Sequence, residues 1–169
     1  DSSTRITNNI MCIWLEVSKP FRGNRENLIY GISVVNIFTG KSQLFEYECP
    51  YYMNPTTFDE MERCVSVFSP SEVIVVSSLE QSIVNTILQY AGVQCNSIHR
   101  INSMSEKAVN CSKQIYIRHI ISKFFGEESY AICTEFNNYT LATQSFCYLS
   151  DFIQEHNPGL VNKISIPHF

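Results

Sequence analysis

The first fifty residues alternate between apolar and polar positions with a period of two, which is typical of half-buried β-strands. Residues 9–17 are rich in Ile, Trp and Val, residues 28–38 form a β-branched and aromatic run, and residues 42–49 alternate. Thr39, Gly40 and Lys41 join the second run to the third with residues that favour a tight turn. The pattern predicts three consecutive antiparallel strands.

The period changes to that of a helix after residue 54. Asn54 is a good N-cap, and Pro55 suits the first helical position because its missing N–H costs nothing there. Apolar residues then recur every three or four positions as far as Phe68, and Ser69-Pro70 ends the helix. The next segments predict a buried strand over 72–77, a helix over 82–90 and a weaker strand within 93–101.

The last third is predominantly helical. Residues 102–110 are polar and predicted to be irregular, whereas 112–125 and 141–155 predict helices, the second with Thr140 as its cap. The tail is predicted to be extended because Ile166 precedes Pro167. The order of elements predicts an α/β domain in which an antiparallel hairpin edge is joined to parallel strands by crossover helices.

Composition supports one folded domain. The chain has 169 residues, of which 44% are hydrophobic and 17% charged, so it is long and apolar enough to bury a core. Its net charge of −4 argues against a dedicated nucleic-acid binder, which usually shows a basic face. No apolar run has the length of a membrane span, and the first residues lack an apolar signal core, so no membrane partner is expected.

The cysteines predict free thiols. Their number is odd, no two have a CxxC spacing, and most lie in apolar runs. We therefore expect an intracellular, reducing compartment, left open among cytoplasm, nucleus, organelle and viral compartment, and no intramolecular disulfide. The seven are Cys12, Cys49, Cys64, Cys95, Cys111, Cys133 and Cys147.

The order of elements is that of the ribonuclease H-like fold, with a mixed sheet of about five strands. Three further stretches resemble the connector domain, domain II, of the MutS family of DNA mismatch-repair proteins. The entry strand after Asn8-Asn9, the hairpin within 30–47 and the step SPSEVIVVSS at 69–78 are similar to that domain. The closing helix with Leu149 and Phe152, followed by Pro167-His168, resembles its exit pattern.

The resemblance implies a non-catalytic connector that links mismatch-binding and lever/ATPase domains and offers a docking surface. It divides the chain into a core, 1–139, and a C-terminal helix with an extended exit, 140–169. The expected anchors to neighbouring domains are residues 7–10 at one end, and the helix 141–155 with the tail 163–169 at the other. The implied partners are those domains, mismatched DNA bound through the full-length protein, and a MutL-like protein. ATP and magnesium are implied only for the full-length protein, since no Walker motif occurs here.

The resemblance implies that this segment has no catalytic, cofactor-binding or metal-ligating residues. The positions of the carboxylates in the sequence lead to the same expectation. A ribonuclease H-type nuclease needs convergent carboxylates for divalent ions, usually starting from an Asp midway along the first strand of the fold's hairpin. The residue best placed in 28–38 is Asn36, which is neutral and is predicted to set the turn. Glu16 ends the earlier strand but adjoins a loop. Glu72 precedes the fourth strand, and the end of that strand has Ser77 and Ser78 instead of a carboxylate.

Other polar groups give no stronger signal. The four histidines, His99, His119, His156 and His168, are not spaced as a metal pair. Lys19, Arg22 and Arg25 form a loop that is either solvated or in contact with phosphate. The aromatic residues Phe45, Tyr47, Tyr51 and Tyr52 are expected to pack along an edge strand rather than stack on bases. Two alternatives stay open: a ribonuclease H-like nuclease or resolvase domain, and a free-standing protein-interaction domain.

Overall fold

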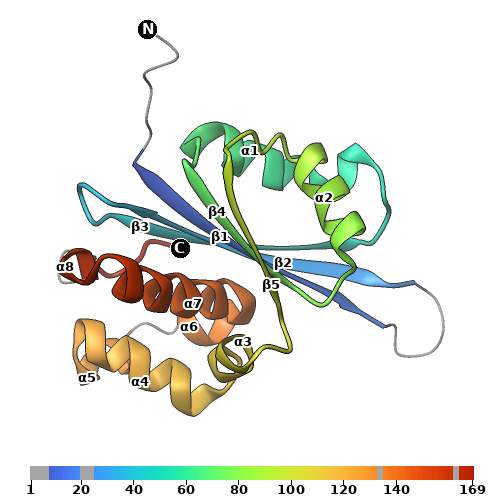
Figure 1. Ribbon diagram of the computed structural model, residues 1–169. Helices are drawn as coiled ribbons and strands as arrows, with labels where there is room; N and C mark the ends of the chain where they lie inside the picture. The colour runs from blue at the N-terminus through green and yellow to red at the C-terminus, as the bar shows by residue number, and fades with distance from the viewer. Residues whose placement is uncertain (1–7, 20–24, 133–134, 162–163) are drawn as a thin grey trace, which may run out of the picture.

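A five-stranded sheet with the strand order β3-β2-β1-β4-β5 forms the centre of the molecule (Figure 1). The computed structural model describes residues 8–19, 25–132, 135–161 and 164–169. The strands are β1 (Asn9–Ser18), β2 (Asn27–Asn36), β3 (Ser42–Pro50), β4 (Glu72–Ser77) and β5 (Ser97–Asn102). β1, β2 and β3 are antiparallel neighbours, whereas β4 pairs in parallel with β1 and β5 with β4. The predicted fold class, an α/β domain with a mixed sheet of five strands flanked by helices, is confirmed.

Helices cover both faces of this sheet (Figure 1). One face carries α1 (Asp59–Phe68) and α2 (Gln81–Tyr90), the helices of the crossover connections. The other carries α7 (Thr140–His156), with further helices beyond it. These are α3 (Glu106–Cys111), α4 (Gln114–Phe125), α5 (Glu127–Ile132), α6 (Glu135–Asn138) and α8 (Pro158–Val161).

The alternation along β1 divides the core into two clusters. Met11, Ile13 and Leu15 pack toward α1 and α2, whereas Cys12 and Trp14 pack toward α7. Successive side chains of a strand point to opposite faces, so a central strand covered on both sides is buried throughout. β1 is this central strand, and it therefore fixes which residues lie beneath α7.

Three differences from the boundaries predicted by the sequence affect the helices around the sheet. Asn54 accepts a hydrogen bond from the Thr57 amide (3.2 Å), as predicted, but the first turn is a 3₁₀ turn over Pro55–Phe58 before α1 begins. Residues 102–110, expected to be irregular, contain the start of α3, whose buried side is only Ala108 and Cys111. Thr140 lies within α7 rather than capping it.

The C-terminal tail returns to the edge strand. The Leu44 amide donates to the His168 carbonyl (2.7 Å), and the His168 amide donates to the Ser42 carbonyl (2.9 Å). Thr7 and Lys163, which belong to the expected anchor segments, lie outside the described residues. None of the helices in the described ranges has the length and apolar character needed to span a bilayer.

Candidate nuclease site

Glu16 is the carboxylate that the central strand places on the α7 face of the sheet. It lies two residues beyond Trp14, which belongs to the cluster under α7, so both side chains point to the same face. Trp14 is buried, and its Nε1–H donates to Glu16 Oε1 (3.2 Å). The indole thus orients a carboxylate that is itself exposed to solvent.

Glu48 lies in the same cross-strand row. Glu16 pairs with Ile29 of β2, and Ile29 pairs with Glu48 of β3, so the three side chains share one face. Two strand spacings separate the two glutamate backbones by about 9.5 Å, with only Ile29 between them. Glu48 is exposed like Glu16. Two exposed carboxylates therefore flank one apolar side chain near the end of the β1–β2 hairpin.

Glu46 is on the same face but is used to hold α7. Its Oε1 accepts hydrogen bonds from the Leu141 amide (2.6 Å) and the Ala142 amide (3.0 Å), the first free N–H groups of the helix. The negative charge also complements the positive end of the helix dipole. Gly31, opposite Glu46 in the register, lets the helix approach because a Cβ there would lie 2.2 Å from the Ala142 nitrogen.

Asn36, the best placed residue of the predicted strand 28–38 but a neutral and poor metal ligand, lies at the opposite end of the sheet. It pairs with Asn9 at the start of β1, and its Oδ1 accepts from the amides of Phe38 (3.0 Å) and Thr39 (2.9 Å). Its predicted role in setting the turn is confirmed. The first strand of the hairpin is β1 and not β2, so the strand that carries Glu16 is the one to which the carboxylate argument applies.

The end of β4 provides no carboxylate. Ser77 is buried, and its Oγ accepts from the Leu79 amide (3.1 Å), which closes the turn after the strand. Glu72 begins β4, where its Oε1 lies 3.1 Å from His99 Nε2, at the other end of the strand from Ser77. These two residues are placed as the sequence predicted.

The hairpin end provides two exposed carboxylates, Glu16 and Glu48, as candidate ligands for a hard divalent cation. No group of three His, Cys, Asp or Glu that could hold a metal ion occurs in the part of the chain that the structure describes. A two-ion site with three or more convergent carboxylates is therefore not formed by those residues. Mg²⁺, however, commonly binds to one or two carboxylates, several waters and substrate phosphates, and Glu16 and Glu48 suit that arrangement.

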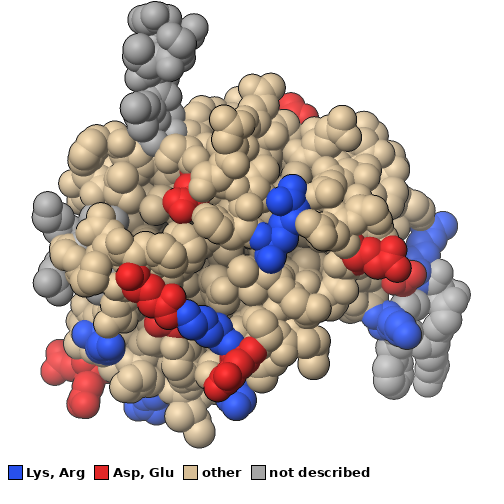
Figure 2. Space-filling model, viewed as in Figure 1, with Lys and Arg blue, Asp and Glu red and all other residues tan. Residues whose placement is uncertain are grey.

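Cations lie at the same end of the hairpin. Lys19 follows β1 and Arg25 precedes β2, and both are exposed, whereas Arg22 lies outside the described residues. Acidic and basic side chains gather at the right-hand edge of Figure 2, where the hairpin ends. Cations beside exposed carboxylates suit a phosphate group that approaches a bound divalent ion.

The thiols beneath α7 are unsuited to nucleophilic or ligand chemistry. Burial raises the pKa of Cys12 and Cys147 well above the ordinary thiol value, and that of Cys111 to about 12. A thiolate is the reactive form, so these groups stay protonated and inert. Six cysteines are free, as predicted, and Cys133 lies outside the described residues.

Histidines and aromatic residues contribute no catalytic pair. His99 contacts Glu72, His156 stacks on Phe152 (ring centroids 4.1 Å apart) and His168 joins the tail to β3. Phe45, Tyr47 and Tyr51 pack against the cluster under α1 and α2, as expected for an edge strand.

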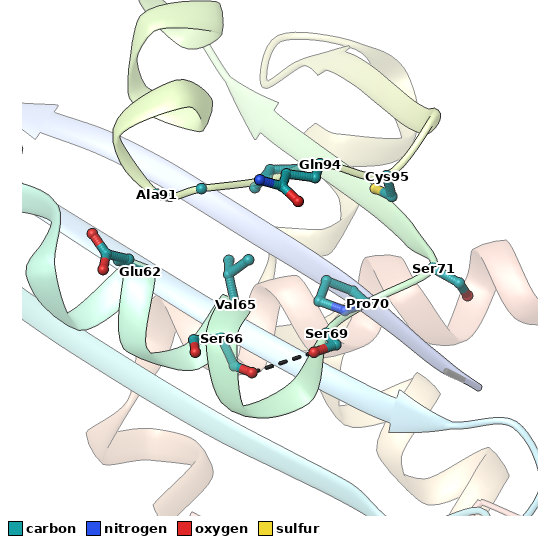
Figure 3. A pocket seen from close by; sticks show the side chains of 11 residues that line it. Glu62, Val65, Ser66, Ser69, Pro70, Ser71, Ala91, Gln94 and Cys95 are labelled. Carbon is teal, nitrogen blue, oxygen red and sulfur yellow. Dashed lines mark hydrogen bonds between the residues drawn. The ribbon is translucent and has the colours of Figure 1, made fainter. Parts of the chain in front are cut away.

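The pocket in Figure 3 lies elsewhere, between the C-terminal ends of α1 and α2. It has a volume of about 610 Å³, and Glu62 is the only charged residue in its lining. Ser69, with a φ of 43°, closes α1 there, and its Oγ donates to the Ser66 carbonyl (3.3 Å). The pocket is near the start of β4, whereas Glu16 is near the end of β1, so the two lie at opposite ends of the parallel strands.

Comparisons with known proteins give matches only among solved structures. No protein-family model matches the chain, and no curated protein matches it. The crystal structure of the fowlpox virus Holliday junction resolvase is 15% identical, with a TM-score of 0.46, over 86% of this chain and 99% of that one. The same resolvase bound to Holliday junction DNA is 14% identical, with a TM-score of 0.44 over the same shares. At these identities the likeness is one of fold.

These matches correct two expectations. These matches contradict the prediction that this segment is not an enzyme, since both matched structures are of a resolvase. The assignment to DNA mismatch repair and to MutS is wrong on the same ground. The connector role itself, which depended on the MutS resemblance, stays an untested prediction.

Proposed function

We propose that this chain is a nuclease or resolvase domain of the ribonuclease H-like class, which cleaves phosphodiester bonds in nucleic acid with the help of a divalent cation. The observation that carries the proposal is the position of Glu16. It is the exposed carboxylate on the α7 face of the central strand, and Glu48 shares its row. A metal-dependent nuclease of this class needs a carboxylate on that strand.

Each residue at the hairpin end has a distinct part in this proposal. Glu16 and Glu48 would hold Mg²⁺, which supplies Lewis acidity toward a phosphoryl oxygen when bound. Trp14 fixes the orientation of Glu16 through its Nε1–H. Lys19 and Arg25 attract the phosphate backbone, and Glu46 keeps α7 seated against the same face.

The test is cleavage of labelled nucleic acid by the purified chain with Mg²⁺ or Mn²⁺. A four-way DNA junction, a linear duplex and an RNA–DNA hybrid serve as substrates. We expect metal-dependent cleavage of at least one of them, and a loss of roughly 100-fold in Glu16→Gln and Glu48→Gln because a ligand is removed.

Glu62→Gln is the matched control, since it removes the same charge from an exposed glutamate on α1. It should cleave like the unmodified chain. Absence of metal-dependent cleavage on all three substrates would overturn the proposal. So would equal activity of the Glu16→Gln variant and the control.

A further inference from the structure

A cavity lies at the carboxyl ends of the parallel strands β4 and β5, and we call it the β4–β5 cavity. Its volume is about 380 Å³, which lies in the range of roughly 300–1,000 Å³ that is usual for ligand sites. Val75 of β4 and Val84 of α2 contribute apolar surface to its lining. The charged side chains of the lining are Glu80 and Arg100.

The chain leaves β4 and β5 toward opposite faces of the sheet (Figure 1). After β4 it continues into α2, whose Val84 belongs to the cluster under α1 and α2. After β5 it continues into α3, whose Ala108 and Cys111 belong to the cluster on the α7 side. Where the connections of neighbouring parallel strands diverge in this way, a crevice forms outside their carboxyl ends, and ligands of open α/β sheets bind there. The position of the β4–β5 cavity therefore favours a ligand site.

The two turns that border the β4–β5 cavity are fixed by hydrogen bonds within the protein. The Ser103 amide donates to the Ser77 carbonyl (3.1 Å), which ties the turn after β5 to the end of β4. The Leu79 amide donates to Ser77 Oγ (3.1 Å), and the Met104 amide donates to Asn102 Oδ1 (2.8 Å). The cavity is therefore largely preformed, as ligand sites usually are.

The two charges of the lining are available to a ligand. Arg100 Nε donates to Asn85 Oδ1 (2.7 Å), which orients the guanidinium and leaves its Nη groups with no partner among the described residues. Glu80 precedes α2, and its side chain makes no capping hydrogen bond. Neither residue takes part in the ion pairs found within the described part of the chain. A ligand of the cavity therefore meets donors from Arg100 and acceptors from Glu80.

We infer that the β4–β5 cavity binds a guanine base of the nucleic-acid substrate. An arginine can donate to both O6 and N7 of guanine, and this is the commonest specific contact between a protein and a base. The N2 amino group of guanine is a donor, and a carboxylate such as Glu80 accepts from it. A phosphate group suits the cavity less well, because Glu80 would repel it. The contact with N2 uses the pairing edge, so the guanine must be unpaired.

The inference rests on the proposed function for the source of the base. Leu15 pairs with Ser77 in the register of β1 and β4, so Glu16 lies at the same end of the parallel strands as the cavity. β5 is two strand spacings from β1, about 9.5 Å, which about three nucleotides span at the rise that they have in a duplex. A strand with one base in the cavity therefore has a phosphodiester group within reach of Glu16.

The experiment measures fluorescence anisotropy of short, labelled DNA strands in EDTA. Each strand is a run of thymidines with one test base at its centre. A central guanine should bind about tenfold tighter than a central thymine or cytosine. 7-Deazaguanine lacks the N7 acceptor and should lose most of this preference. Hypoxanthine lacks the N2 amino group and should lose part of it.

Two variants assign these contacts to the cavity. Arg100→Gln should bind guanine and 7-deazaguanine strands with affinities within about twofold of each other. Glu80→Gln should bind guanine and hypoxanthine strands within about twofold, yet still prefer guanine to 7-deazaguanine. Arg63→Gln and Glu62→Gln are the matched controls, since each removes the same charge from an exposed residue of α1, and both should keep every preference. Circular dichroism shows whether each variant is folded.

Three results would overturn the inference. The first is equal binding of the guanine and thymine strands. The second is a guanine preference that persists in both Arg100→Gln and Glu80→Gln, because the base would then be read elsewhere. Guanosine monophosphate, added in place of the strands, separates a free nucleotide from a nucleic acid. The third result is binding of this mononucleotide without binding of the guanine strand.

The inference and the proposed function can fail separately. A guanine preference that is lost in the Arg100 and Glu80 variants but not in the controls, without metal-dependent cleavage, would support the inference and reject the proposed function. Cleavage that requires Glu16, together with equal binding of the guanine and thymine strands, would do the reverse.

Discussion

Gly31 is the residue on which the position of α7 depends. The ideal Cβ at this site would lie 2.2 Å from the Ala142 nitrogen and from the Leu141 carbonyl carbon, both of which are backbone atoms. Backbone of a buried helix cannot move aside as a flexible side chain can. The sequence shows a glycine within a strand, but only the approach of α7 explains why the strand lacks a side chain there.

We expect Gly31→Ala to lower the free energy of unfolding by about 3 kcal/mol, because the helix must shift away from the sheet. Urea unfolding followed by circular dichroism measures the change. Gly159→Ala is the control, since no atom lies within 4 Å of its ideal Cβ, and it should change stability by no more than about 1 kcal/mol. Comparable stability of the two variants would contradict the close approach.

At the scale of single residues, Asp151 is a carboxyl whose pKa is changed by burial. Burial raises the pKa of its carboxyl above the ordinary value, and the hydrogen bond from Tyr116 opposes this rise. A carboxyl whose pKa is higher in the folded state than in the unfolded state binds its proton more tightly when the chain is folded. Its contribution to stability is fully present below the unfolded pKa and is lost as the pH rises through the folded pKa.

The variant Asp151→Asn keeps a hydrogen-bonding partner for Tyr116 and cannot ionise. We expect its stability relative to the unmodified chain to increase as the pH rises from about 4 to 7, because only the unmodified chain must bury a charge. Urea unfolding at several pH values tests this. Glu155→Gln, one turn further along α7, is the comparison. A relative stability of Asp151→Asn that falls or stays flat with rising pH would refute the assignment.

At the scale of elements, the start of α7 is held by a distant strand rather than by its own sequence. Glu46 of β3 accepts from the Leu141 and Ala142 amides, although 95 residues separate Glu46 from Leu141. Thr140, which the local pattern favours as a cap, is already helical. A capping interaction between segments so far apart leaves no local signal in the sequence.

We expect Glu46→Gln to lower the free energy of unfolding by about 1 kcal/mol, since it removes the charge–dipole attraction while leaving an amide oxygen as acceptor. Glu46→Ala, which removes both, should cost about 2 kcal/mol. Thermal unfolding compares them with Glu48→Ala, an exposed residue of the same strand. If Glu48→Ala destabilises the chain as much as Glu46→Ala, the helix is not anchored by Glu46.

The sequence predicts the strands and long helices well because their hydrophobic periods are local. The strand over 72–77 coincides with β4, and the helix predicted over 112–125 corresponds to α4 (Gln114–Phe125). The candidate site was missed because it depends on strand order and register. Only the order β3-β2-β1-β4-β5 makes β1 the central strand, and only the register puts Glu16 and Glu48 in one row.

On the scale of the whole molecule, the two faces of the sheet differ: one packs against an apolar cluster, and the other carries the residues of the candidate site. The face toward α1 and α2 is a closed apolar cluster, with the one-carboxylate pocket between the ends of those helices. The other face carries Glu16, Glu46 and Glu48 toward the hairpin end. The proposed function therefore concerns one side of the molecule.

The distribution of thiols gives a prediction for the intact chain. Cys12, Cys111 and Cys147 are fully buried, and burial also raises the pKa of the half-buried Cys49 and Cys95. The thiolate is the form of cysteine that attacks a thiol reagent, so labelling of the native chain at neutral pH should be slow at all five. Denaturation without reductant should expose about seven reactive groups, because none is expected to be paired.

Titration with a chromogenic disulfide reagent, with and without denaturant, measures both quantities. A sample reduced and then desalted gives the reference count. Equal numbers of reactive thiols in the reduced and unreduced denatured samples, together with slow labelling of the native chain, would support cysteines that pack in the core rather than form a redox centre. Five or fewer groups in the unreduced denatured chain would mean that at least one disulfide exists. Rapid native labelling would show that the thiols beneath α7 are reached by opening of the outer helices, which the burial of Ile117 and Ile121 argues against.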